Sequence, residues 1–188
     1  MCWFWRTCFS RRYSSGVLRY LKEDITAMLQ LKGGQASNLG KFSADVSDKF
    51  FLTNNFRVSN VNTKTFVLLL CQESPLSFVS GTPIDLAVKL KNYNKTEFHH
   101  TMPKKFVETL GETKHSVNAL ANFSFVSRAE NRHLGGDAPS IYKAKMGSDP
   151  DNILKKSLCP NNLFDDDYDA FVLERAKLLA EAAKLLLE

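Results

Sequence analysis

The sequence predicts a mostly α-helical α+β fold, in which bundle-like helical segments surround one small β-hairpin. Apolar side chains recur at helical spacing over residues 17–31 and again over residues 167–187. Two short runs, residues 95–98 and residues 120–126, instead have the character of strands. A single hairpin held inside a helical protein follows from this contrast.

Helices are expected on both sides of the hairpin. The first two cover residues 3–13 and 17–31; Ser14-Ser15-Gly16 separates them, and Gly33-Gly34 ends the second. The aspartates at 165–167 precede the last helix, where acidic side chains offset the helix macrodipole, and this explains them better than a metal site does. The other expected segments are short helices and loops over 36–60, a helix over 63–71 capped by Asn62, a loop over 73–85, and helices over 139–145, 151–156 and 167–187.

A short helix should follow the hairpin and lie close to it. Because successive side chains of a strand point to opposite faces, Glu97 and His99 should share one face, and His100 should leave the strand at its end. Ser127 can N-cap a helix that runs through Asn131. The order strand, loop, strand, helix therefore predicts that His99, His100 and Asn131 meet.

Charged side chains are distributed unevenly along the chain. Residues 91–146 carry nine basic and five acidic side chains, whereas residues 147–188 carry five basic and nine acidic ones. The chain as a whole has a net charge of +5. A basic surface attracts a phosphate backbone without reading its sequence, so this modest excess gives some support to a nucleic-acid partner.

Cysteine usage and hydropathy exclude several classes of protein. The four cysteines are scattered without a C-x-x-C pair, which argues against a zinc ribbon and against a disulfide framework. The longest apolar run, residues 66–71, is far shorter than the roughly 20 residues that a membrane helix needs. A cytoplasmic protein is expected, and the arginine-containing, acid-free residues 1–16 leave mitochondrial targeting open as the alternative.

The histidines indicate a chemistry. All four lie between residues 99 and 133, and the segment Glu97-Phe98-His99-His100-Thr101-Met102-Pro103 is followed by Asn122 and then by Asn131-Arg132. Metal-dependent phosphodiester cleavage needs a side chain that holds a divalent cation, a neutral imidazole that deprotonates water, and a further ligand. Each residue alone has an ordinary structural explanation, and their order and spacing favour the chemical one.

This pattern resembles the HNH (ββα-metal) nuclease motif. More narrowly, the chain is similar to the C-terminal part of GmrSD-type restriction endonucleases. The resemblance extends to segments such as Pro75-Leu76-Ser77-Phe78, residues 118–122, and Tyr168-Asp169-Ala170-Phe171. It implies an HNH subdomain over residues 94–146, between a helical region over 1–93 and a helical tail over 147–188 that packs on the core. It also implies an upstream ParB-like, nucleotide-hydrolysing domain that is absent from this chain.

The resemblance implies a role for each matching residue. His100 corresponds to the general base, and His99 and Asn131 to metal ligands. Asn122 corresponds to the scaffold asparagine that ties the loop to the second strand. Glu97 corresponds to an outer-shell partner of His99 or a ligand in its own right.

Phosphate contacts and the metal follow from the same comparison. Arg132, Lys105 and Arg128 are the expected phosphate-binding side chains. A site with oxygen and imidazole ligands and open positions fits Mg²⁺ or Mn²⁺ best, with Zn²⁺ or Ni²⁺ as alternatives. Thr101-Met102 departs from the bulkier apolar pair expected after His-His.

The sequence thus predicts a metal-dependent DNA endonuclease of the HNH restriction type. Two other classes stay open: an inactive remnant that binds nucleic acid without cutting it, and a structural helical interaction module. His115, in a polar loop, and His133, on the helix beside Arg132, are expected to be surface residues without a part in the chemistry.

Overall fold

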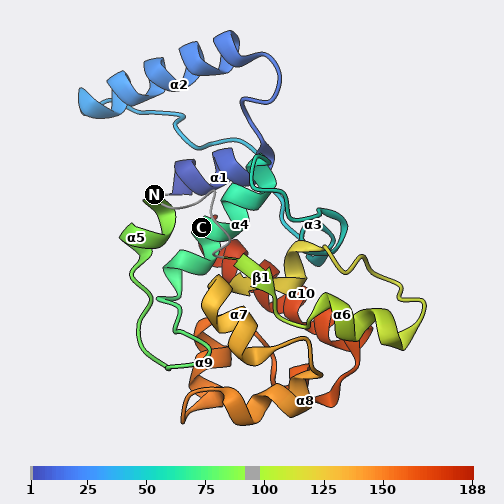
Figure 1. Cartoon of the computed structure of the whole chain (residues 1–188). Helices are drawn as coiled ribbons and strands as arrows, with labels where there is room; N and C mark the ends of the chain where they lie inside the picture. Colours follow the sequence, from blue (N-terminus) through green and yellow to red (C-terminus); the bar gives the residue numbers. More distant parts are fainter. Residues whose placement is uncertain (1, 92–97) are drawn as a thin grey trace. The chain divides into compact units, whose positions relative to one another are not determined.

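The computed structural model of the chain describes residues 2–91 and 98–188 (Figure 1). The chain divides into unit 1, Met1–Val46 with Ala182–Glu188, and unit 2, Ser47–Glu181. The described residues are mostly helical and contain one two-stranded sheet, which confirms the predicted class. None of their helices is long and apolar enough to cross a membrane.

The predicted helices and strands occur in the predicted order, but the first helix ends at Ser10 instead of residue 13, and two short helices, Leu86–Lys91 and Lys104–Val107, were not predicted. The strands are β1 (Phe98–His100) and β2 (Phe123–Phe125). The helices are α1 (Cys2–Ser10), α2 (Val17–Lys32), α3 (Asp48–Thr53), α4 (Val61–Gln72), α5 (Leu86–Lys91), α6 (Lys104–Val107), α7 (Arg128–Leu134), α8 (Pro139–Tyr142), α9 (Pro150–Lys156) and α10 (Tyr168–Leu185). Short 3₁₀ turns cover Glu108–Leu110, Leu120–Asn122, Lys143–Lys145 and Asn161–Asp165.

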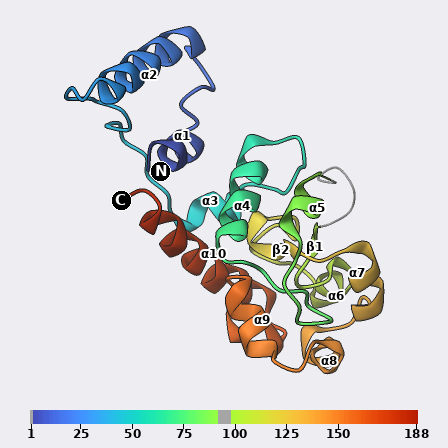
Figure 2. The ribbon, with the colours of Figure 1, turned by 90° about the vertical axis from the view of Figure 1, so that its left-hand side faces the viewer.

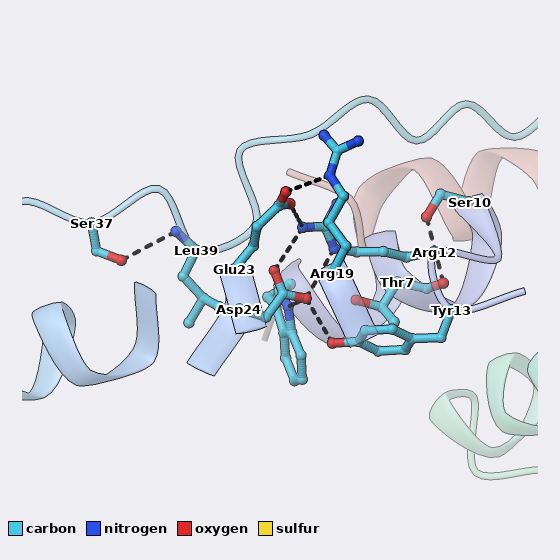
Figure 3. A network of polar contacts seen from close by, with 10 residues as sticks. Thr7, Ser10, Arg12, Tyr13, Arg19, Glu23, Asp24, Ser37 and Leu39 are labelled. Carbon is cyan, nitrogen blue, oxygen red and sulfur yellow. Dashed lines mark hydrogen bonds and ion pairs between the residues drawn. The ribbon is translucent and has the colours of Figure 1, made fainter. Parts of the chain in front are cut away.

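A buried ion pair holds unit 1 together. Asp24 of α2 is 4% exposed, and Arg12 binds it through two hydrogen bonds of 2.8 and 2.9 Å. Tyr13 and Trp3 donate to the same carboxylate at 2.6 and 3.2 Å. Figure 3 shows Arg12 and Tyr13 pointing toward Asp24. Burial alone would raise the pKa of Asp24, but the hydrogen bonds from Arg12, Tyr13 and Trp3 outweigh it and lower that pKa.

Replacement of Asp24 by asparagine should destabilise unit 1 by about 1.5–3 kcal/mol, the range for losing hydrogen bonds to a charged group. Both tryptophans, Trp3 and Trp5, lie in α1, so urea denaturation followed by tryptophan fluorescence reports on this unit. Because folding lowers the pKa of Asp24, its contribution is present above pH 3.8 and is lost as pH falls through the lower folded value. If the Asp24→Asn variant lost as much stability on acidification as the wild type does, this assignment would be contradicted.

Aromatic side chains build the core of unit 2 around the hairpin. The ring of Phe56 stacks on Phe123 with 4.3 Å between centroids, and Phe98 meets Phe125 across the sheet at 4.9 Å. Phe171, on α10, is fully buried in the same unit. Such pairs contribute beyond the area they bury, which makes the hairpin part of the core.

The hairpin is antiparallel, and Phe98, His99 and His100 pair with Phe125, Ser124 and Phe123. Figure 2 shows β1 and β2 side by side with α7 near them, and α7 contacts β1. The predicted second arm, residues 120–126, is wrong at its start, because Leu120–Asn122 forms a 3₁₀ turn closed by a bond from Asn122 N to Ala119 O. The predicted strand residues 95–97 lie outside the described residues.

The start of α4 also differs from the expectation. Asn60, and not Asn62, is the N-cap residue, and its side-chain oxygen accepts from the backbone N–H of Asn62 at 2.9 Å. Asn62 is buried in the first turn, where its amide donates to the side chain of Asn54 at 2.7 Å. Both asparagines suit a helix start, so the sequence pattern could not select between them.

Candidate functional site

Strand β1 places the two histidines on neighbouring positions with opposite directions. The prediction that His100 leaves the strand at its end is wrong: His100 remains in the ladder and pairs with Phe123. Its ring also lies against the Phe123 ring, with 4.4 Å between centroids. The strand pairing and this ring contact together restrict the position of His100.

Asn122 fixes the loop that follows His100, as predicted. Its side chain is fully buried, accepts from the backbone N–H of Met102 at 2.9 Å, and donates to the carbonyl of Met102 at 3.1 Å. A further bond to the carbonyl of Val117, at 3.0 Å, ties the same amide to the segment before β2. An asparagine amide supplies both a donor and an acceptor, so it satisfies both backbone groups of the buried residue Met102.

Helix α7 begins with the predicted cap at Ser127. The Ser127 side chain accepts from the backbone N–H of Glu130 at 3.2 Å, and Glu130 accepts from the backbone N–H of Ser127 at 2.8 Å, which completes a capping box. Glu130 also accepts from the hydroxyl of Ser77, so it links α7 to the loop after α4. Asn131 is the next residue, and its position depends on this cap.

Replacement of Glu130 by glutamine should weaken unit 2 by about 1–2 kcal/mol at neutral pH, since hydrogen bonds to a charged acceptor exceed those to a neutral one. Burial would raise the pKa of Glu130, but bonds from Ser77 and Ser127 outweigh it and lower that pKa. Its contribution is therefore present above pH 4.5 and lost as pH falls through the folded value. Urea denaturation by circular dichroism at several pH values checks this, and a variant whose stability follows pH as the wild type does would contradict it.

Most of the predicted site residues line one pocket. It has a volume of about 360 Å³ and lies between β1, the start of α6 and α7. Its described lining residues are His99, His100, Pro103, Lys104, Lys105, Asn131, Arg132, Gly135 and Gly136. The pocket thus brings together both histidines, the amide and two of the three expected phosphate-binding side chains.

Three predicted residues are not on the described wall of this pocket. Asn122 is buried under the loop after His100, where it has the structural contacts given above. Arg128 is exposed at the first turn of α7, and it is absent from the lining. Glu97 lies outside the described residues.

The imidazole of His100 meets a partner that sequence reasoning did not single out. Its Nε2 lies 3.1 Å from the side-chain oxygen of Asn118. Burial is the main cause that lowers the pKa of His100; the nearby charges of His99 and Lys104 lower it further, and the bond to Asn118 opposes them. The ring is therefore biased toward its neutral form, which is the form that accepts a proton.

A buried arginine binds residues that neighbour the two histidines. Arg175 of α10 is fully buried, and burial lowers its pKa. Its five N–H groups all donate to uncharged oxygens at 2.8–3.2 Å, namely Leu158 O, Thr101 Oγ1, Ala121 O, Ser124 Oγ and Ser157 O. Thr101 follows His100, and Ser124 pairs with His99. The hydroxyl of Thr101 thus has a specific partner, which accounts for a polar residue at this buried position.

The donor set suits a cation that keeps much of its water. Within residues 2–91 and 98–188, no group of three or more His, Cys, Asp or Glu side chains could hold a metal ion. The described lining of the pocket instead offers the His99 imidazole and the Asn131 side-chain amide as ligands, beside the imidazole of His100. A closed zinc site needs four protein ligands, whereas Mg²⁺ and Mn²⁺ are commonly bound by few side chains and several waters. The residues present fit the latter.

A larger cavity, of about 530 Å³, lies in unit 1 beside Arg12 and Asp24. Its walls carry charges of both signs, and Arg12 is already paired with Asp24 and Glu23. Its described lining contains no imidazole, and two acidic side chains offset most of the charge of its three basic ones. The pocket of unit 2 is the stronger functional candidate on chemical grounds.

Comparison of the sequence with family profiles and with curated proteins, and of the fold with solved structures, returned no match.

Proposed function

We propose that unit 2 is a metal-dependent DNA endonuclease of the HNH type. One observation carries the proposal: His99, His100, Asn131, Lys105 and Arg132 line a single open pocket although they come from three separate elements. The function of a helical interaction module does not require these side chains to line one pocket. Their order along the chain and their shared pocket match the needs of phosphodiester hydrolysis.

Each side chain in the pocket has a separate role in the proposed reaction. Lys105 and Arg132 bind non-bridging oxygens of the scissile phosphate and orient it in the pocket. His100 accepts a proton from the attacking water as the water oxygen bonds to phosphorus and the bond to the leaving oxygen breaks. Asn122 keeps the loop after His100 in place, and it does not contact the substrate.

His99 and Asn131 would hold the divalent cation. When bound, Mg²⁺ or Mn²⁺ would supply positive charge that stabilises the developing charge on the phosphate and on the departing oxygen. The capping box at Ser127 fixes the start of α7, the helix that carries Asn131. The described lining of the pocket is mostly polar, which would leave a bound cation open to water.

A nicking assay on supercoiled plasmid DNA tests the proposal. The wild-type chain with Mn²⁺ should convert supercoiled to nicked circles, and EDTA should stop the conversion. The His115→Ala variant is the matched control, because His115 belongs to the same sequence region but not to the described lining of the pocket.

Three outcomes separate the classes of function. Nicking that needs the cation supports the endonuclease. Retardation of the plasmid in a gel without any nick would identify a binding remnant, and neither nicking nor retardation would leave a structural module. Nicking that persists in EDTA would contradict the metal-dependent chemistry proposed for this pocket.

A further inference from the structure

The side chain of Asn118 faces the ring of His100 with an atom that can only accept. The distance from His100 Nε2 to the Asn118 side-chain oxygen is 3.1 Å. An amide oxygen has no proton to donate, so Nε2 must carry the hydrogen of this bond. In a neutral imidazole only one nitrogen is protonated, and Nδ1 is then the nitrogen with a free lone pair.

The backbone of Asn118 is held independently of its side chain. Its carbonyl accepts from the backbone N–H of Phe56 at 2.8 Å, and its N–H donates to the hydroxyl of Ser116 at 3.2 Å. The next residue, Ala119, forms a bridge with Asn55. These contacts attach residue 118 to the segment between α3 and α4, so its amide is presented to the ring from a fixed point.

The ring of His100 is constrained from the other directions as well. Its backbone belongs to β1, and its ring contacts the tilted ring of Phe123 at 4.4 Å between centroids. Phe123 is in turn stacked on Phe56, the residue whose N–H binds the carbonyl of Asn118. One cluster of contacts therefore positions both members of the hydrogen bond.

We propose that Asn118 is a positioning residue that fixes His100 as the Nε2–H tautomer and leaves Nδ1 as the atom that accepts the proton from water. The inference rests on the proposed function, in which His100 is the general base. Asn118 itself need not touch the substrate, since it acts through the imidazole. A base with the wrong tautomer presents N–H where a lone pair is required, and it cannot accept the proton.

Two substitutions and two readouts test the role. Asn118→Ala removes the acceptor, and Asn118→Asp keeps an oxygen at the same place. Residue 118 is solvent-exposed and is anchored by main-chain atoms, so both variants should fold, which circular dichroism checks. The first readout is the ¹⁵N shift of the His100 ring in metal-free, histidine-labelled protein at a pH where the ring is neutral. The second is the kcat and KM of DNA nicking with Mn²⁺.

In the wild type, the shifts should identify Nε2 as the protonated nitrogen. Asn118→Ala should show a mixture of tautomers, and its kcat should fall by about 10- to 100-fold at unchanged KM, the range for loss of an outer-shell hydrogen bond. Asn118→Asp should restore the Nε2–H tautomer and part of kcat. His115→Ala should leave both readouts as in the wild type.

Each contrary result has a distinct meaning. Protonated Nδ1 in the wild type, or an alanine variant with unchanged tautomer and kcat, overturns the positioning role. A wild-type protein with protonated Nε2 that never nicks DNA overturns the proposed function, and the catalytic purpose of Asn118 with it. The ring shifts separate these cases because they require no substrate and no metal.

Discussion

Replacement of His100 by alanine should reduce DNA cleavage by about 10²- to 10⁴-fold in kcat, the contribution of a positioned general base. The imidazole lines the pocket beside Lys105 and Arg132, and no other described histidine except His99 does so. The fold should persist, because the backbone bonds of β1 do not involve the imidazole. Nicking rates at saturating Mn²⁺, with circular dichroism as the check on folding, measure the effect.

The pH dependence of the wild type follows from the same imidazole. Burial lowers the pKa of His100, so the ring should stay neutral, and cleavage should continue, somewhat below the ordinary value of 6.5. Activity should fall only as pH drops through the lowered pKa, because protonation removes the lone pair. If the His100→Ala variant cleaved DNA as fast as the wild type does at saturating Mn²⁺, another group would have to be the base.

Replacement of Arg175 by methionine should destabilise unit 2 by more than about 4 kcal/mol, a size that few single substitutions reach. Methionine fills part of the volume but donates no hydrogen bond. The carbonyls of Ala121, Ser157 and Leu158 would lose their Arg175 donor inside the protein, and each such loss costs about 1–3 kcal/mol. Urea denaturation followed by circular dichroism measures the change.

Lys177 supplies the matched control for Arg175. It is an exposed basic residue on the same helix, α10, and its replacement by methionine should change stability by no more than about 0.5 kcal/mol. Arg175→Met should also reduce cleavage, because the guanidinium holds Thr101 and Ser124 next to the histidine pair. Equal stabilities of the two variants would mean that the buried hydrogen bonds contribute little.

The fold class was predictable because its signals are local. Helical periodicity predicted α2 and α10, and Ser127 as N-cap predicted the start of α7. Asn122 was predicted to bind the loop after His100, and it does so through Met102. These features depend on residues that are close in sequence or on a short motif with a fixed spacing.

The errors arose where distant contacts decide the local structure. Residues 120–122 were predicted as part of a strand, but they form a 3₁₀ turn, in which Leu120 bonds to Asn54 and Asn122 to Met102. The same limit applied to His100, which pairing with Phe123 keeps in the strand. Strand ends depend on the partner strand, which no local pattern specifies.

Two supporting residues were not predicted from the sequence. Arg175 lies in an amphipathic helix where a basic residue usually faces solvent, and its partners are up to 74 positions away. Asn118 lies 18 positions from His100 in a polar segment where asparagine is common in turns. A weak signal did exist for Arg175, since helical spacing puts it on the same face of α10 as Phe171, Val172 and Leu179.

Calorimetric titration with Mn²⁺ is the most direct test of the proposed metal site, because it needs neither DNA nor turnover. The wild-type chain should bind one ion at a saturable site, and His99→Ala and Asn131→Ala should each weaken binding by at least about 10-fold, the lower end of the range known for lost outer-shell contacts. The His115→Ala variant should bind as the wild type does. Absence of saturable binding to the wild type, or unchanged binding in both the His99 and the Asn131 variant, would contradict a metal site in this pocket.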